Sequence, residues 1–451
     1  MSADFIEWDR KTPFLLPPSI EEWLPEGHLA RFVVEIVEQL DLSSLKEAYG
    51  GRGSQPHNPA MLVSLLFYGY AVGVFSSRKL ERSTYDSVAF RYIAVNSHPD
   101  HDTIAHFRKR FLEELTGLFV QILWIARQMG VLKLGNVSLD GSKVKANASK
   151  HKALSYEHAC KLEAQLKNEV AALLQKAEAA DRTDLPDGLS IPEELQRREG
   201  RLDAIRNAKA EIERRAAERH AREQAAYREK MAERAHREQE TGKKPPGKQP
   251  QPPVPGPTGK DQVNLTDEDS RIMPTSAGFE QCYNAQAGVD VTTKIIVSAH
   301  ITQEPNDKQQ VEPSLAKMAA LPKELGEVTG LISDSGYFSE TNVQVCESQG
   351  ITPYIAVDRE HHNQNPWDRF REPPALPEDA DAVSRMKHRL KTAAGKATYA
   401  LRKVSSEPVF GIIKAVMGFR SFQMRGLEAA EGEWNLACMA WNIKRLHALT
   451  R

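Results

Sequence analysis

The sequence predicts an α+β or α/β protein in which an all-α N-terminal domain precedes a mixed-sheet domain that a helical insertion interrupts. Helical periodicity dominates the first 130 residues, whereas short β-type runs that alternate with helical patterns follow after about residue 131. A tract of almost pure helix formers separates the first of these runs from the others. We therefore expect three domains, formed by residues 1–130, by 131–150 together with 266–451, and by 151–265.

The N-terminal domain is expected to be a bundle around one buried helix. That helix begins at Asn58-Pro59, with Asn as N-cap and Pro at the first helical position, and runs to about Phe75. It is apolar on nearly all sides, which places it at the centre of the bundle. Further helical patterns cover residues 19–47, where apolar residues keep a three- and four-residue spacing, 76–95, where basic residues are interleaved, and 115–130.

A basic helix is expected within residues 98–111, HPDHDTIAHFRKRF. Asp102 would cap it, and Arg108, Lys109 and Arg110 would lie on its surface. Two interpretations stay open. The basic residues are either the solvated face of a core helix or the face of a helix-turn-helix-like element that enters the major groove of DNA.

The second domain is expected to contain a mixed sheet, because strand-like and helical segments alternate along it. The β-type runs are residues 137–140, 283–301, 328–334 and 351–357. Helical patterns between the later runs cover residues 307–320 and 339–349.

The predicted insertion consists of a helical hairpin or coiled coil and a linker. Two apolar stripes at helical spacing support the hairpin, one of Leu162, Leu166, Val170, Leu173 and Ala177, the other of Leu195, Leu202, Ile205, Ile212 and Ala216. The stripe pattern dissolves into mixed charge past residue 220, and residues 242–260 are a Pro-rich segment typical of a flexible linker.

Bulk composition limits the function classes. The 451 residues carry a formal net charge of −1, so any electrostatic argument for a nucleic-acid partner must be local. Four dispersed cysteines without a CxxC pair indicate neither a zinc ribbon nor a disulfide framework and fit a reducing cytoplasm. No Walker-type motif occurs, which argues against a nucleotide cofactor. The longest apolar run, residues 61–75, is too short to span a membrane.

Three acidic residues are the candidates for catalysis. Asp140 and Asp334 each end a β-type run, and Glu407 is the only acid between Arg385 and Arg425, a segment with ten Lys and Arg residues. Carboxylates at the rim of a sheet, joined by one from a helix, can hold Mg²⁺, and two such ions can activate a water or hydroxyl and stabilise the leaving oxygen of a phosphodiester. The basic surround would hold a polyanion. Taken singly, each aspartate could instead be a turn or cap residue, and Glu407 could simply relieve its cluster of cations.

Several ordered stretches resemble a DDE insertion-sequence transposase with an RNase H-like catalytic core. Tyr399, Arg402, Glu407 and Lys414 are similar to the family's Y…R…E…K signature, although four residues rather than three separate Arg402 from Glu407. The other similar stretches are residues 57–81, 88–111, 137–149, 264–273, 283–290, 330–339 and 425–446.

The resemblance implies a DNA transposase that binds terminal inverted repeats, cleaves the DNA and joins the freed 3′-OH ends to target DNA. Asp140, Asp334 and Glu407 would be catalytic and would hold two Mg²⁺ (or Mn²⁺) ions per active site. The DNA-contacting residues would be Arg402, Lys414, Tyr399, Lys143, Lys145, Arg108, Lys109 and Arg110. Asn284 and Gln286, which share one face of a strand, either line the cleft or satisfy the sheet.

The expected partners are double-stranded DNA, as element ends and target, and further copies of the chain in a homodimer or higher oligomer. Neither a membrane nor a nucleotide cofactor is expected, and the location implied is prokaryotic-type cytoplasm, associated with the nucleoid. Two alternatives remain at this point. One is a metal-dependent DNA nuclease without strand joining, and the other is a non-catalytic DNA-binding protein.

Overall fold

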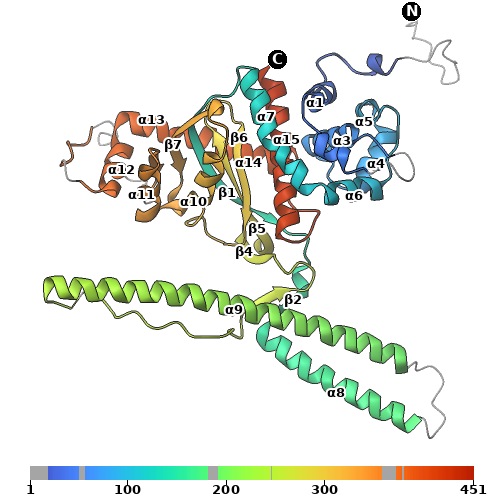
Figure 1. Cartoon of the computed structure of the whole chain (residues 1–451), viewed down its shortest axis with the longest axis vertical. Helices are drawn as coiled ribbons and strands as arrows, with labels where there is room; N and C mark the ends of the chain where they lie inside the picture. The colour runs from blue at the N-terminus through green and yellow to red at the C-terminus, as the bar shows by residue number, and fades with distance from the viewer. Residues whose placement is uncertain (1–18, 50–55, 181–190, 245, 358–371, 378–379) are drawn as a thin grey trace, which may run out of the picture. The chain divides into compact units, whose positions relative to one another are not determined.

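The computed structural model describes the chain except residues 1–18, 50–55, 181–190, 245, 358–371 and 378–379 (Figure 1). It divides into two compact units. The first unit comprises Met1–Val144 and Tyr283–Arg451, and the second unit comprises Lys145–Cys282. The predicted helical N-terminal region and mixed sheet are both confirmed.

The first unit begins with short helices packed around α3 (Pro59–Val72), whose residues are mostly buried. Asn58 caps this helix as predicted, since its Oδ1 accepts the Ala60 N–H at 2.9 Å, and Gly73 ends it at a φ of 86°. The surrounding elements are η1 (Ile20–Trp23), α1 (Leu29–Glu38), α2 (Ser43–Glu47), α4 (Ser77–Asp86), α5 (Val88–Ile93), α6 (His101–Arg110) and α7 (Leu112–Gln128).

Two expectations for these helices are wrong in detail. The continuous patterns at 19–47 and 76–95 are broken into shorter elements, the second of them at Ser87, which has an extended backbone. The cap of α6 is Asp100 rather than Asp102, because Asp100 Oδ1 accepts the Thr103 N–H at 2.7 Å. Asp102 lies in the first turn, where a negative charge still favours the helix dipole.

The sheet of the first unit has the strand order β6 (Ile296–Thr302), β5 (Gly278–Asp290), β1 (Leu134–Lys145), β7 (Gly326–Ser333), β8 (Thr352–Ile355). β1 is parallel to β7 and β7 is parallel to β8, whereas β5 is antiparallel to β6. β5 is also antiparallel to β1, since Asn136 bonds to Val291 while Ala146 bonds to Gln281. This order is compatible with the RNase H-like core that the resemblance implies.

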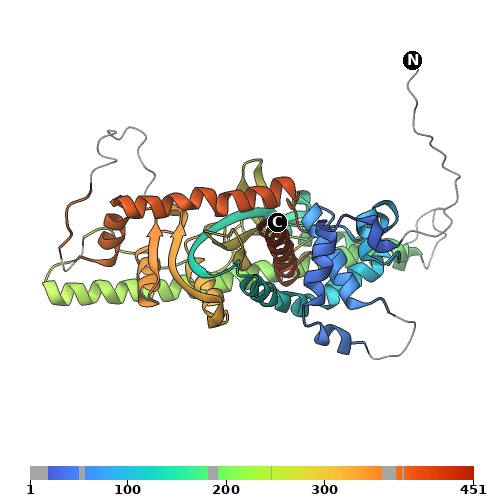
Figure 2. The ribbon, with the colours of Figure 1, turned by 90° about the horizontal axis from the view of Figure 1, so that it is seen from above.

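Helices cover the sheet (Figure 2). The helices α10 (Val311–Ala319) and α15 (Leu427–Leu449) pack on β6, and α11 (Glu340–Ser348), α12 (Ala382–Lys391) and α13 (Ala393–Ala400) pack on β8. Two buried polar side chains fix α15 to the strands. Trp434 Nε1 donates to the Gln286 carbonyl at 2.9 Å, and the Asn442 amide bonds to both the N–H and the carbonyl of Ile296 at 2.8 Å. Because α15 also packs on α3 and α7, it joins the N-terminal helices to the sheet.

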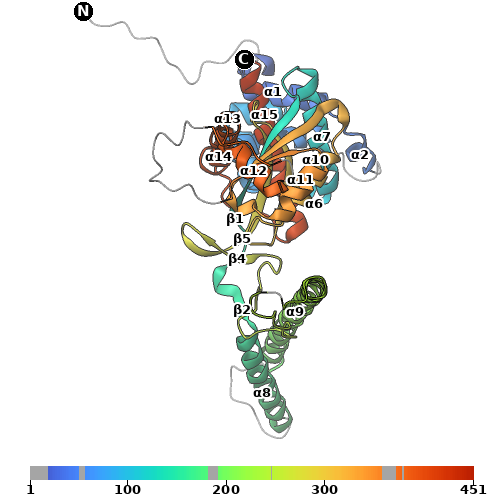
Figure 3. The same cartoon turned by 90° about the vertical axis from the view of Figure 1, so that its left-hand side faces the viewer.

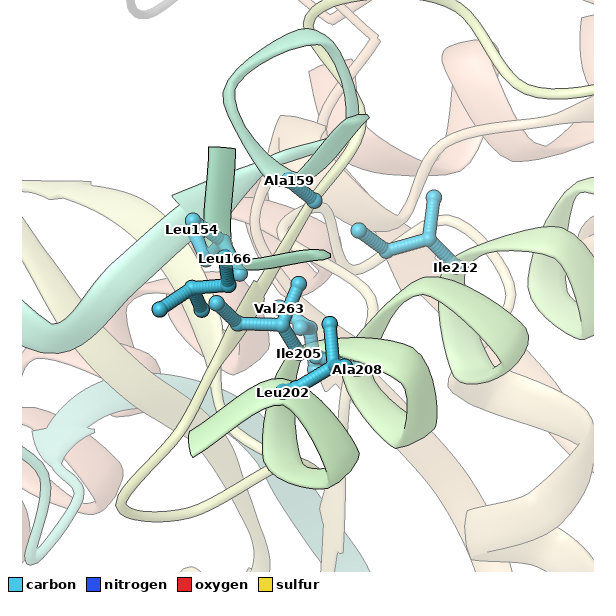
Figure 4. Close-up of a cluster of buried hydrophobic side chains, with 8 residues drawn as sticks. All are labelled: Leu154, Ala159, Leu166, Leu202, Ile205, Ala208, Ile212 and Val263. Carbon is cyan, nitrogen blue, oxygen red and sulfur yellow. The ribbon is translucent and has the colours of Figure 1, made fainter. Parts of the chain in front are cut away.

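The second unit contains two long helices, α8 (Tyr156–Ala180) and α9 (Ile191–Thr241), together with the strand pair β2 (Ala153–Ser155) and β3 (Gln262–Asn264) (Figure 3). β4 (Arg271–Thr275) pairs antiparallel with the first residues of β5. A buried apolar cluster holds α8, α9 and the strand pair together (Figure 4), and its members are Leu154, Ala159, Leu166, Leu202, Ile205, Ala208, Ile212 and Val263.

The apolar stripe of the second helix fades past residue 220, as the sequence indicates, but α9 itself continues to Thr241. Its last turns lack an apolar stripe and are mostly exposed. In the turns before residue 220, opposite charges four residues apart pair along the helix, as in Arg214 with Glu218 and Arg215 with Glu211.

Among the described residues, no single helix is long and apolar enough to cross a membrane. The helices α3 and α4 pass that test only as a pair, by length and composition, and they are bent by 95° at their junction.

Arg108 is a buried structural residue, not the exposed DNA contact that the sequence suggested. Its side chain is 6% exposed and donates to Tyr70 Oη at 3.0 Å and to the Phe75 carbonyl at 2.9 Å. Tyr70 Oη in turn donates to Glu433 Oε1 at 2.8 Å. Burial raises the pKa of Glu433, and the charge of Arg108 opposes that rise. This network links α3 and α6 to α15.

Replacing Arg108 by Met should lower the free energy of unfolding of the first unit by about 3–5 kcal/mol, because the Glu433 carboxylate would stay buried without its counter-charge. Urea denaturation followed by tryptophan fluorescence reports on this unit, since all six tryptophans lie outside residues 145–282. The matched control is Lys109→Met on the exposed side of the same helix, which should change stability by less than about 0.5 kcal/mol. Equal denaturation midpoints for the two variants would contradict the assignment.

Candidate active site

Two of the predicted catalytic acids lie side by side at one edge of the sheet. The parallel pairing of β1 with β7 sets Ser138 opposite Ile332, and Asp140 and Asp334 each follow two residues later. A two-residue step keeps side chains on the same face of a strand, so both carboxylates emerge together. Asp334 follows β7 directly, as predicted. Asp140 does not end its strand, because β1 continues to Lys145.

The third acid, Glu407, lies on α14 (Ser406–Gly411), which a buried hydrogen bond fixes against β1. Ser406 Oγ and Ser138 Oγ are 3.0 Å apart, and both side chains are buried. The first precedes Glu407 by one residue and the second precedes Asp140 by two. Glu407 is therefore held beside the strand that carries Asp140.

Arg402 faces all three acids. Its Nη2 donates to Glu407 Oε1 at 2.6 Å. Burial acts to lower the pKa of Arg402, but Tyr399 and the charges of Glu407, Asp140 and Asp334 raise it overall. Arg402 is thus close to the carboxylates and pairs with Glu407, and Tyr399 lies near Arg402.

The environment of Asp140 opposes its negative charge. Burial is the main cause that raises the pKa of Asp140, to about 6, and the nearby charges of Asp334 and Asp307 add to it. The Gly141 N–H, which donates to Asp140 Oδ1 at 2.8 Å, and the charge of Arg402 act in the opposite direction. A carboxyl group with such a perturbed pKa is characteristic of functional sites.

A fourth acid, Asp307, lies in the same place and was not expected from the sequence. Its Oδ1 accepts Asn284 Nδ2 and Gln286 Nε2, both at 2.7 Å, and it lies 3.7 Å from Lys143 Nζ. The Tyr337 hydroxyl donates to Gln286 Oε1. The two amides thus share one face of β5 as predicted, and their role here is to hold Asp307.

Gly141 is required by the close approach of these groups. A Cβ atom at this position would lie 2.8 Å from Asp307 Oδ1 and would collide with Gln286 Nε2. Any larger residue after Asp140 would therefore displace either the amide or the carboxylate. The sequence shows this requirement only as a glycine directly after Asp140. The reason for the glycine is its contact with Gln286, which lies 145 residues later in the chain.

Lys414 fixes the segment that follows Asp140. It lies on a π-helical segment, Ile412–Val416, so its spacing from Glu407 does not amount to two α-helical turns as expected. Its Nζ nevertheless reaches β1, where it donates to Ser142 Oγ and, at 2.7 Å, to the Lys143 carbonyl.

The remaining predicted DNA contacts lie elsewhere. Lys145 belongs to the second unit and pairs with Glu280 at 3.0 Å. Lys109 and Arg110 are exposed on α6, and the guanidinium of Arg110 also donates to the Ala48 carbonyl at 2.8 Å.

The donor chemistry of the site suits a hard divalent cation. Carboxylate oxygens are the ligands that Mg²⁺ prefers, and the mutual repulsion of Asp140, Asp334 and Asp307 would be relieved by one. Among the described residues, however, no three acidic, histidine or cysteine side chains are already arranged as a metal-binding group. Glu407 would have to break its ion pair with Arg402 to become a metal ligand.

Comparison with known families explains this arrangement. A family model described as a transposase domain (DUF772) matches residues 18–110, and a family model described as a transposase DDE domain matches residues 253–443. The chain belongs to the DDE insertion-sequence transposases. No curated protein and no solved structure gives a significant match.

The two matches cover the transposase unevenly. The DDE match includes Asp334 and Glu407, whereas Asp140 lies outside both matches and is placed at the site by the β1–β7 pairing. Membership implies a polynucleotidyl transferase or nuclease that acts on DNA, in a family that generally uses divalent metal ions.

Replacing Asp140 by Asn should stabilise the metal-free transposase at neutral pH. Folding raises the pKa of Asp140 from 3.8 to about 6. The ionised carboxylate therefore costs the wild type no stability below about pH 4, and this cost grows until the pH has risen through 6. The variant should exceed the wild type by on the order of 2–3 kcal/mol at pH 7.5 and by about 1 kcal/mol at pH 4.5. Tryptophan-detected urea unfolding in EDTA measures this. A difference that does not change with pH would refute the argument, and Glu312→Gln, on the exposed face of α10, is the control.

Proposed function

We propose that the protein is a DNA transposase that binds the terminal inverted repeats of its element, cleaves the DNA and joins the 3′-OH ends to target DNA. The observation that carries the proposal is the convergence of Asp140 and Asp334 on neighbouring parallel strands, with Glu407 tied to β1 through Ser406. We further propose that these three residues hold two Mg²⁺ or Mn²⁺ ions. Bound there, the ions would activate the attacking water or hydroxyl and stabilise the leaving oxygen.

The protein's own groups complete the phosphoryl-transfer site. Arg402 presents a planar, always charged guanidinium that suits a phosphate. Arg402 pairs with Glu407 in this structure. If the glutamate turned to bind a cation, the guanidinium would become available to DNA. Lys414 holds the backbone after Asp140 in place, and Lys143 adds positive charge beside Asp307. Tyr399, half-buried next to Arg402, would position the guanidinium or contact DNA.

The other parts of the chain are proposed to bind DNA and further copies of the transposase. Lys109 and Arg110 are exposed at the end of α6 and form the basic part of the N-terminal DNA-binding domain, residues 1–130. Residues 151–265 are proposed as a helical hairpin insertion with a linker. The two helices of this hairpin, α8 and α9, are a candidate surface for a homodimer or higher oligomer.

Cleavage assays with DNA that carries the element's terminal repeats test the catalytic assignment. Asp140→Asn, Asp334→Asn and Glu407→Gln should each lower Mg²⁺-dependent cleavage by at least roughly a hundredfold, more than the loss of a supporting residue gives, while gel-shift binding is retained. Glu312→Gln is the matched control that removes a carboxylate from an exposed helix face. Unchanged cleavage by either aspartate variant would rule out the assignment.

Strand-joining assays separate a transposase from a nuclease. The same reaction supplied with target plasmid should yield joined products that depend on all three acids. Cleavage without any joined product, in Mg²⁺ or in Mn²⁺, would instead favour a nuclease.

The salt dependence of DNA binding tests the N-terminal surface. If Lys109 neutralises one phosphate, Lys109→Met should reduce the slope of log K against log salt by about 0.9. Lys46→Met on α2 removes an exposed charge from another helix of the same region and should leave the slope unchanged. Equal slopes for Lys109→Met and the wild type would contradict a phosphate contact at this position.

A further inference from the structure

We propose that Asp307 is a fourth carboxylate of the divalent-cation site, sharing a cation with Asp140 and Asp334. The inference rests on the proposed function and extends the acid set beyond the three residues of the family signature. Asp307 lies in the connection between β6 and α10, so a different part of the chain supplies it.

The carboxylate of Asp307 is held in a fixed orientation. Asn284 and Gln286, both fully buried on β5, each donate an amide hydrogen to Oδ1 at 2.7 Å. Two charge-assisted hydrogen bonds from rigid side chains leave the group little freedom. Among the described residues no hydrogen bond goes to Oδ2, which is therefore the oxygen available to a ligand.

The free oxygen of Asp307 and a carboxylate oxygen of Asp334 both lie beside Gly336. A Cβ atom built on Gly336 would lie 3.7 Å from Asp307 Oδ2 and 2.9 Å from Asp334 Oδ1. Both carboxylates therefore border the space that a side chain at Gly336 would fill. Without a cation, this arrangement brings like charges together at a cost.

The same three aspartates act on one buried hydroxyl. Burial raises the pKa of Tyr337 well above its usual value, and the next causes are the charges of Asp307, Asp140 and Asp334, in that order. Glu407 is not among these causes. Asp334 and Asp307 are also among the charges that raise the pKa of Asp140, and Glu407 is not.

An unsatisfied oxygen lies beside Asp307. Asn284 is fully buried and uses its Nδ2 for Asp307 and for the Glu304 carbonyl, at 3.1 Å, while its Oδ1 has no donor among the described residues. Buried polar atoms without partners are uncommon and call for an explanation. An oxygen-rich surround of this kind is what a hard cation selects.

The cations already present do not balance the acids. Arg402 pairs with Glu407, and Lys143 pairs with Asp307 at 3.7 Å, which is longer than a hydrogen bond. No ion pair to Asp140 or Asp334 occurs in the described part of the chain. A divalent cation would supply the missing charge.

The competing explanation is that Asp307 only accepts the two amides and so supports β5. Asp307→Asn separates the two, because asparagine keeps an oxygen that can accept both amide hydrogens while it removes the charge. A role as acceptor alone predicts unchanged cation binding. A role as a cation ligand predicts weaker binding with the fold retained.

Mn²⁺ binding to the full-length protein, without DNA, provides the readout. The dissociation constant would be measured from the electron paramagnetic resonance signal of free Mn²⁺ for the wild type, Asp307→Asn, Asp140→Asn and the control Glu312→Gln. We expect Asp307→Asn to raise the constant at least about tenfold, as Asp140→Asn does, and Glu312→Gln to change it less than about twofold. Tryptophan fluorescence would check that each variant is folded.

The outcomes distinguish this inference from the proposed function. If Asp140→Asn weakens Mn²⁺ binding and a folded Asp307→Asn does not, Asp307 is an amide acceptor and the inference is overturned, while the transposase proposal stands. If the wild type binds no Mn²⁺, both fail. Should Asp307→Asn not fold, Lys143→Met tests the same point, because removing the ammonium that competes for Asp307 should tighten Mn²⁺ binding several-fold. Binding that stays the same would overturn the inference.

Discussion

The parallel pairing of β1 with β7 is the constraint on which the rest of the site depends. It sets two aspartates from distant parts of the chain at the same height and on the same face of the sheet. Neither aspartate could be moved by one residue without pointing to the opposite face. The hydrogen bond between Ser138 and Ser406 then places the helix of Glu407 in relation to the same strand. The geometry of the acids is thus a consequence of strand register and one buried contact.

This register has an energetic cost that the surrounding structure must offset. Asp140 is desolvated beside two other carboxylates, which is why its pKa is raised to about 6. The first unit supplies compensating stability elsewhere, through the buried face of α15 and the network of Arg108, Tyr70 and Glu433. Sites that bind highly charged ligands are commonly destabilising in this way, and their folds are stabilised at a distance from them.

Much of the fold and part of the site could be predicted from the sequence. Periodicity and capping residues identified the helices, and short β-type runs identified the strands, because both depend on local patterns. The position of Arg108 along its helix indicates that the side chain is buried. It lies four residues after Ile104 and three before Phe111, both buried, so its helical phase indicates the core although its charge suggests the surface.

Asp307 shows a limit of a different kind. It lies in a loop without periodicity. The amides that hold it belong to β5, which precedes β6 along the chain and pairs with it. Nothing local distinguishes it from other loop aspartates. In the same way, α9 remains helical to Thr241 although its apolar stripe fades past residue 220, so the stripe alone does not mark the end of the helix.

Arg402 explains how these acids can coexist before any cation arrives. Its guanidinium pairs with Glu407 and lowers the pKa of Asp140, so it relieves repulsion that would otherwise oppose folding. Because the same group suits a phosphate, DNA and a cation would together replace this pairing in the proposed reaction. The cation would bind the glutamate and the phosphate would bind the arginine. A lysine would neutralise the acids but could not offer a bidentate contact to the phosphate. Stabilising the carboxylates and binding the proposed substrate would therefore require the same residue.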